Sequence, residues 1–205
     1  MVFPKHLELS GRYDRLNQKL EVAVVHYPDA YVQFLVHFHG DRDYFECHEI
    51  LEEYWKEHTD REKNSVWVGL IQLAVALYHH RRRNNKGAAT MIRQSKQKIT
   101  SFSPECEELA LDSKDLIKLI SEIEGAILTG SPYQSVVLPL TDSALIKVCK
   151  NECRRSGYTW GNDSNLSDPE LIDRHKLRDR SEVISMRNQA LLNRSKLNGG
   201  PERHE

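Results

Sequence analysis

The chain of 205 residues contains no apolar run long enough to cross a membrane. The longest run, residues 65–78, is interrupted by Gln72 and is shorter than the roughly twenty residues that a membrane-spanning helix needs. The N-terminal residues contain no apolar segment of the length that a secretory signal requires. We therefore expect a cytoplasmic protein that does not associate with membranes.

Cysteine is scarce, and its spacing argues against disulfides. The four cysteines are at positions 47, 106, 149 and 153. Cys149 and Cys153 are one helical turn apart, and two cysteines on one helix are poorly placed to bond to each other. Cys47 falls among apolar residues that face a core. Reduced thiols, as expected in the cytoplasm, are the simplest interpretation.

Several signatures of enzymes are also missing. The chain has no glycine-rich phosphate-binding loop, no nucleophile elbow and no Cys-x-x-Cys pair. What the chain does have is a polar composition, with 39% hydrophobic and 29% charged residues, which is typical of a helical protein with a modest core. The sequence alone does not decide whether the protein is an enzyme.

Apolar residues at helical spacing predict an all-α fold. Capping residues, glycine and proline divide the pattern into helices joined by short turns, which is the arrangement of an up-and-down bundle. The expected helices cover residues 28–40, 43–57, 65–83, 84–103 and 112–130. We assign residues 1–130 to this bundle, residues 131–198 to an extended strap and a helical C-terminal arm, and residues 199–205 to a disordered tail.

Two consecutive helices organise the bundle. In the first, Asp43 precedes Glu46 by three residues, which is the arrangement of a capping box, so we expect this helix to begin there. The second helix, residues 65–83, is apolar over most of its circumference, which is typical of a buried central rod. Its polar residues gather in a narrow stripe that includes Gln72 and His79.

Polar side chains on these two helices form the candidate site. His48 and Glu52 are four residues apart and are therefore neighbours at the edge of the apolar stripe. Gln72 and His79 are two turns apart and point in the same direction. If the two helices pack together, the candidate cluster consists of His48, Glu49, Glu52, Gln72, His79 and His80. It is either a hydrogen-bonded network that fixes helix packing or a binding site.

A divalent transition metal is one candidate ligand. His48, Glu52 and His79 offer the nitrogen and oxygen donors that zinc, manganese or iron accept. Glu49 would then act as the general base toward a metal-bound water. Against such a hydrolase, the segment lacks the second histidine, four residues after the first, that makes the metalloprotease motif specific.

Charge is unevenly distributed, although the net charge is only −1. Residues 40–63 contain nine acidic side chains, whereas residues 64–104 contain none and carry seven basic ones. The two segments can attract each other within the bundle. Alternatively, the basic turn at residues 81–86 binds phosphate, free or in a nucleic acid. The missing base-stacking aromatics argue against nucleic acid.

Taken together, these residues resemble a known family. The motifs that carry the resemblance are Tyr44-Phe45-Glu46, His48-Glu49-Ile50-Leu51-Glu52, Trp55, Gly69-Leu70-Ile71-Gln72-Leu73-Ala74, His79-His80 and Gly87-Ala88. Over about residues 36–99 they are similar to the prokaryotic domain of unknown function numbered 309. The resemblance implies a small all-helical domain of the bacterial or archaeal cytoplasm, and it implies no reaction, substrate or catalytic residue.

The expected C-terminal helix has a single apolar stripe, so it must dock on its own bundle or on another protomer. The stripe is formed by Val183, Met186, Ala190 and Leu197. This arm and the missing catalytic motifs favour a non-catalytic intracellular module that binds a protein partner or a small ligand and has a structural His/Glu/Gln cluster. The alternatives are a metal-dependent hydrolase and a protein whose basic turn binds phosphate or nucleic acid.

Overall fold

The computed structural model describes residues 27–177. All regular secondary structure in this part is helical, which confirms the prediction of an all-α fold. The helices are α2 (Asp29–His39), α3 (Tyr44–His58), α4 (Val66–Arg81), α5 (Asn85–Ser101), α6 (Ser103–Glu108), α7 (Ser113–Leu128), α8 (Ser143–Arg155), α9 (Pro169–Ile172) and α10 (Arg174–Leu177). The expected C-terminal helix and the tail after Gly199 lie outside the described residues.

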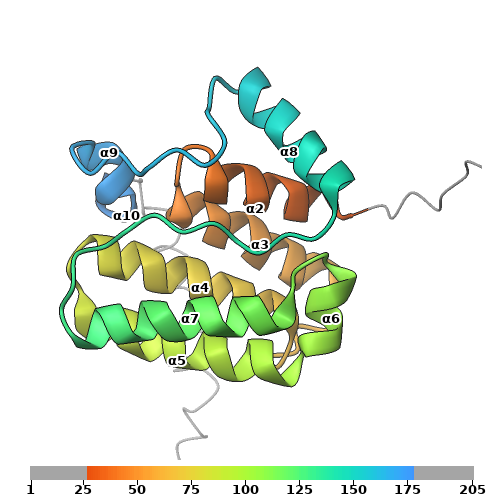
Figure 1. Ribbon diagram of the computed structural model, residues 1–205, viewed down its shortest axis with the longest axis horizontal. Coiled ribbons are helices and arrows are strands. Elements are labelled where there is room, and N and C mark those ends of the chain that lie inside the picture. Colours follow the sequence, from red (N-terminus) through yellow and green to blue (C-terminus); the bar gives the residue numbers. More distant parts are fainter. Residues whose placement is uncertain (1–26, 178–205) are drawn as a thin grey trace, which may run out of the picture.

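Consecutive helices pack side by side around α4 (Figure 1). α4 contacts α3 on one side and α5 on the other, and α7 packs against α5. α2 packs against α3 and is in turn contacted by α8, so the first helix of the C-terminal arm folds back onto the bundle. The central position of α4 agrees with its sequence, which is apolar nearly all round.

The helices begin at the capping residues that the sequence indicates. The side chain of Asp43 accepts a hydrogen bond from the backbone N–H of Glu46, and Asp112 and Asp142 cap α7 and α8 in the same way. The backbone N–H of Asp43 donates to Asp41 and not to Glu46, so only half of the capping box forms. The sequence also missed α6, a short helix that begins directly after α5.

One apolar core joins the bundle to the segments that follow it. Four aromatic or aliphatic residues of α2 are completely buried, and the inward-facing residues of α4, α5 and α7 are completely or almost completely buried. Leu138 of the strap and Cys149 and Cys153 of α8 belong to the same core. On the apolar stripe of α3, Cys47 and Leu51 are buried, whereas Ile50, Tyr54 and Trp55 are only partly buried. All four cysteines are free and buried.

His39 fastens the strap, residues 131–142, to the end of α2. This histidine, the last residue of α2, is completely buried, with 0% of its side chain exposed. Its Nδ1 donates to the carbonyl of Leu35 at 2.9 Å, and its Nε2 accepts from the backbone N–H of Leu138 at 3.0 Å. The ring also stacks on Trp160 with centroids 4.1 Å apart. Both ring nitrogens therefore have partners when the ring is neutral.

Arg42, in the turn between α2 and α3, is a second buried side chain that joins distant segments, and it is 1% exposed. Its guanidinium donates to the carbonyls of Phe38 at 2.8 Å, Val136 at 2.6 Å and Asn162 at 2.7 Å. These acceptors belong to α2, to the strap and to the loop before α9. One side chain thus donates hydrogen bonds to backbone carbonyls of three segments, and buried carbonyls require such donors.

The strap contains no helix and runs along the bundle as an irregular segment (Figure 1). Its one β-type pairing within residues 27–177 is an antiparallel bridge between Leu111 and Leu140, and no strand forms in this part of the chain. Pro139 lacks the N–H that a continued ladder would need. No helix of the described part is long and apolar enough to cross a membrane.

Candidate functional site: the outer face of α4

His48, Glu49 and Glu52 are brought together on α3. His48 Nδ1 lies 3.2 Å from a carboxylate oxygen of Glu49, and His48 Nε2 lies 2.9 Å from one of Glu52. The Nζ of Lys56 lies 2.7 Å from the other oxygen of Glu52. The side chains at positions 48, 52 and 56 are on successive turns of one helix face, so they form a continuous chain of polar contacts, here called the ion-pair chain, in which His48 is charged only when it is protonated.

A metal would fit this group only after rearrangement. Within residues 27–177 it is the one group of three or more His, Cys, Asp or Glu side chains whose ligand atoms all lie within 4.8 Å of one another. The two carboxylates, however, face opposite nitrogens of the same imidazole ring, so an ion on either nitrogen has the other carboxylate across the ring. Lys56 already neutralises Glu52. The arrangement resembles an ion-pair chain more than a closed ligand set.

We expect His48→Ala to change neither metal content nor stability by much. The contacts of His48 with Glu49 and Glu52 are partly solvated, and even full ion pairs at such positions contribute only about 0–1 kcal/mol each. Elemental analysis after incubation with zinc or manganese, together with urea unfolding of the parent and the variant, checks both statements. A near-stoichiometric metal in the parent that is lost in His48→Ala would contradict them and would favour the hydrolase.

The polar residues of α4 turn toward other neighbours. Gln72 donates to a glutamine side chain of α5 at 3.0 Å. Asn84 donates its side-chain amide to His79 Nδ1 at 3.2 Å, and His80 Nε2 donates to the carbonyl of Ser131 at 3.0 Å. Within the described residues these three side chains do not join the α3 group in one hydrogen-bonded network.

The half-buried side of α4 is the feature that unites these residues. We define the outer face of α4 as Val68, Ile71, Gln72, Val75, His79 and the following Arg82. At helical spacing these positions fall within about 100° of arc, and none of them is fully buried or fully exposed. Except for Trp67, all other residues of α4 are buried. The middle of the outer face, at Val68, Ile71 and Val75, is apolar.

Two helices border this face without filling it. On the α3 side, the ring of Phe45 lies 5.9 Å from that of Tyr78 and 5.9 Å from that of His48, which places the ion-pair chain beside α4. On the α5 side, Gln94 accepts the hydrogen bond from Gln72. Most of the side chains predicted as one polar cluster therefore lie on or beside an apolar helix face. His80 is the exception, because it is buried against the strap.

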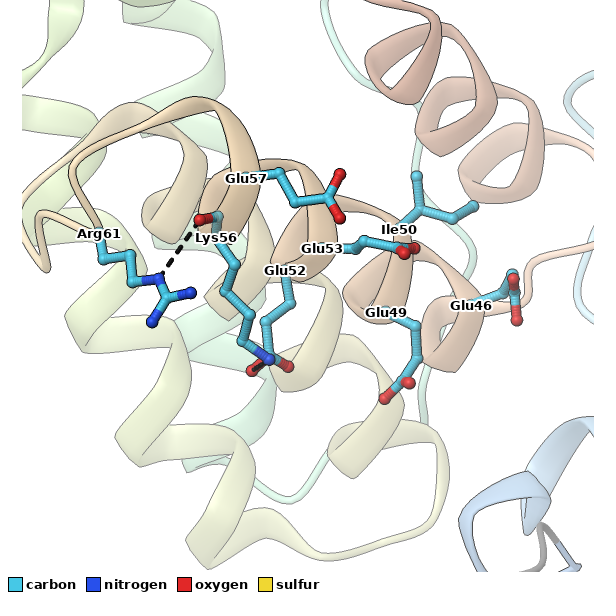
Figure 2. A pocket seen from close by; sticks show the side chains of 8 residues that line it. All are labelled: Glu46, Glu49, Ile50, Glu52, Glu53, Lys56, Glu57 and Arg61. Carbon is cyan, nitrogen blue, oxygen red and sulfur yellow. Dashed lines mark hydrogen bonds and ion pairs between the residues drawn. The ribbon is translucent and has the colours of Figure 1, made fainter. Parts of the chain in front are cut away.

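The solvent side of α3, next to this border, is strongly acidic (Figure 2). An open hollow along the helix is lined by Glu46, Glu49, Ile50, Glu52, Glu53, Lys56, Glu57 and Arg61. In Figure 2 the guanidinium of Arg61 is turned toward the Lys56 carbonyl, and its Nε donates to that oxygen at 3.3 Å. Five carboxylates face two cations in this hollow, so it attracts basic groups, and two of the five, Glu49 and Glu52, also lie at the border with α4.

The basic turn after α4 is used mainly inside the molecule. Arg81 is 6% exposed. The Nε of Arg82 donates to Asp173 at 2.9 Å. The acceptors of Arg81 are the carbonyls of Arg42 (2.6 Å) and Leu171 (2.9 Å) and the hydroxyl of Ser164 (2.9 Å). Two of the three consecutive arginines are thus engaged, which weakens the case for a phosphate site at this turn.

Sequence reasoning missed three buried polar side chains. A signal for two of them was available, because His39 and Arg81 each follow a buried leucine, Leu35 and Leu77, by four residues and so lie on the buried side of their helices. Arg42 gave no such signal. It sits in a turn with φ of 61°, and its acceptors come from distant parts of the chain.

The fold and this surface define a class of protein: an all-α bundle with one apolar helix face that polar side chains border. The chain belongs to the family of the domain of unknown function 309 (DUF309), whose family model matches residues 31–91. It is also 48% identical over 170 residues to "Uncharacterized protein YpuF" of Bacillus subtilis (strain 168), covering 83% of this chain and 98% of that protein. No solved structure matches the chain. The family resemblance read from the sequence is confirmed.

Proposed function

We propose that this protein is a non-catalytic interaction module that binds a basic, amphipathic helix of a partner protein along the outer face of α4. The observation that carries the proposal is the apolar line formed by Val68, Ile71 and Val75. Its members are separated by three and four residues, which is the spacing at which one helix offers contacts to another. An apolar helix face bordered by polar groups marks an interaction site.

The surroundings of the face support a helical partner. α3 and α5 lie on its two sides, so a docked helix would contact three helices at once. Phe45 extends the apolar surface on the α3 side. An apolar helix face bordered by two other helices favours a partner helix with one apolar stripe, which is how amphipathic helices are recognised.

Charge supports a basic partner. The acidic hollow shares Glu49 and Glu52 with the α3 border of the face. Complementary charge at the border of an interface raises the association rate and selects among partners, while the apolar centre supplies most of the affinity. The same carboxylates would repel an acidic helix.

Photo-crosslinking in the cells that make the protein tests this function. A photoreactive residue at Lys56, which is exposed at the acidic border, should form a covalent adduct with a second polypeptide. Val75→Glu should abolish the adduct, because docking a helix there would bury an unpaired carboxylate.

Lys150, an exposed lysine of α8, is the matched control position for the photoreactive residue. An adduct formed equally well from Lys150, or an adduct from Lys56 that survives Val75→Glu, would argue against the proposed surface.

A further inference from the structure

The described chain ends beside the outer face of α4. Asp173 accepts the hydrogen bond from Arg82, and the hydroxyl of Tyr78 lies 2.8 Å from His175 Nδ1. Both contacts are at the C-terminal end of α4. Because α10 ends at Leu177, two residues after His175, the next segment begins near that end of the face.

The segment that follows Leu177 has a charge and an apolar pattern that fit the outer face of α4. Residues 178–198 carry five basic and two acidic side chains, which complements the acidic hollow of α3, whose Glu49 and Glu52 lie at the border of the outer face. At helical spacing, Val183, Met186, Ala190 and Leu197 fall on one side. This segment therefore offers an apolar stripe and a basic flank, the two features that the outer face selects.

The lengths of the two stripes also agree. The stripe from Val183 to Leu197 and the outer face from Val68 to Arg82 each extend over fourteen residue steps, about 21 Å in a helix. A segment that starts at the Arg82 end runs antiparallel to α4. In that register Ala190 lies level with Val75, and Leu197 lies level with Val68.

We infer that residues 178–198 dock antiparallel to α4 on its outer face within the same molecule, and that a partner helix binds by displacing them. The competition rests on the proposed function, whereas the docking does not. The docked arm would act as an intramolecular inhibitor that only a partner of higher affinity for the same face removes.

Amide hydrogen exchange of the full chain, read by mass spectrometry on peptides from residues 178–198, tests the docking. We expect Val75→Glu to accelerate exchange in these peptides by about tenfold or more, because it prevents residues 178–198 from docking on α4 and so exposes their amides to water. Val148→Glu makes the same change at a valine of α8 that is 47% exposed, and should leave their exchange as in the parent.

A reciprocal pair of variants lies in the arm itself. Met186→Glu, within the stripe, should release the arm as Val75→Glu does, whereas Ser185→Glu, on the opposite side of the expected helix, should not. These variants change no residue of the bundle, so they decide the matter if Val75→Glu disturbs α4. Equal exchange in the parent and all variants overturns the docking. Protection that grows with protein concentration also overturns it, because the arm then covers a second copy.

Crosslinking from Lys56 separates the two proposals. If the arm competes with a partner, Met186→Glu should raise the yield of the partner adduct several-fold above that of Ser185→Glu. An equal yield, with the arm released, overturns the competition alone. A docked arm with no partner adduct in any variant overturns the proposed function and leaves the docking intact.

Discussion

Lowering the pH from 7 to 5 is expected to remove about 2 kcal/mol from the free energy of unfolding through His39 alone, and lowering it to 3 about 4 kcal/mol. Burial is the main cause, because it lowers the pKa of His39 from 6.5 to about 3. The charge of Arg42 lowers this pKa further, while the hydrogen bond to Leu35 opposes the shift.

The direction of the effect follows from where the proton binds. Below about pH 6.5 the unfolded chain protonates this histidine, whereas the folded protein does so only near pH 3. The unfolded state thus binds more protons between these values, so stability is fully present above pH 6.5 and falls as the pH falls. Protonation would also remove the Nε2 lone pair that accepts the N–H of Leu138, and with it one fastening of the strap.

Urea unfolding of the parent and His39→Gln at pH 7, 6 and 5 measures this effect. The variant should be less stable at pH 7 by about 1–2 kcal/mol, because it loses the Trp160 stack and one hydrogen bond. Its stability should change less with pH, so that the difference closes near pH 5. Equal losses in the two proteins between pH 7 and 5 would show that His39 is not held neutral by the fold.

His37 provides the control of opposite sign. Burial alone would lower its pKa, but the hydrogen bond and the charge of Asp41 outweigh burial and raise it. Protonated His37 therefore stabilises the folded state as the pH falls. His37→Gln should lose stability with acid more steeply than the parent, whereas His39→Gln should lose it less steeply.

The fold was predictable because its signals are local. Asp43, Asp112 and Asp142 mark helix starts through bonds to residues two or three positions ahead. The apolar residues around most of the circumference of α4 predict a central helix without any knowledge of its neighbours. α6 escaped prediction because Pro104 stops one helix and occupies the first turn of the next, and sequence alone does not separate these roles.

The site was only partly predictable, because helical spacing gives the direction of a side chain and not what it meets. His48 and Glu52 interact because they share one helix, which spacing does predict. Gln72 and His79 do share one face of α4, but the bond of Gln72 goes to α5 and the bond of His79 goes to the turn after its own helix. The bonds of Arg42 to carbonyls 94 and 120 residues away depend on the assembled fold.

Arg81→Met is expected to lower the free energy of unfolding by about 2–5 kcal/mol, because it removes the donor of several buried hydrogen bonds to neutral acceptors. Methionine keeps most of the volume but donates no hydrogen bond. It would leave the carbonyl of Leu171 and the hydroxyl of Ser164 without this donor, at about 1–3 kcal/mol for each group that stays buried. The carbonyl of Arg42 would lose one of its two donors and keep the N–H of Tyr44 at 3.0 Å. The guanidinium also lies 5.0 Å from the centre of the Tyr44 ring, a contact that methionine would weaken.

Arg82→Met is the matched control, because it makes the same change at the next residue. Arg82 pairs with Asp173 at a partly exposed position, so its loss should cost about 1 kcal/mol or less. Urea unfolding at pH 7 compares the two variants, and equal losses would contradict the anchoring role of Arg81. Hydrogen exchange in residues 157–172 should accelerate in Arg81→Met alone, since Ser164 and Leu171 are held to α4 through that guanidinium. The expected difference between two adjacent arginines arises from burial: the acceptors of Arg81 cannot turn to water when it is removed, whereas Asp173 can.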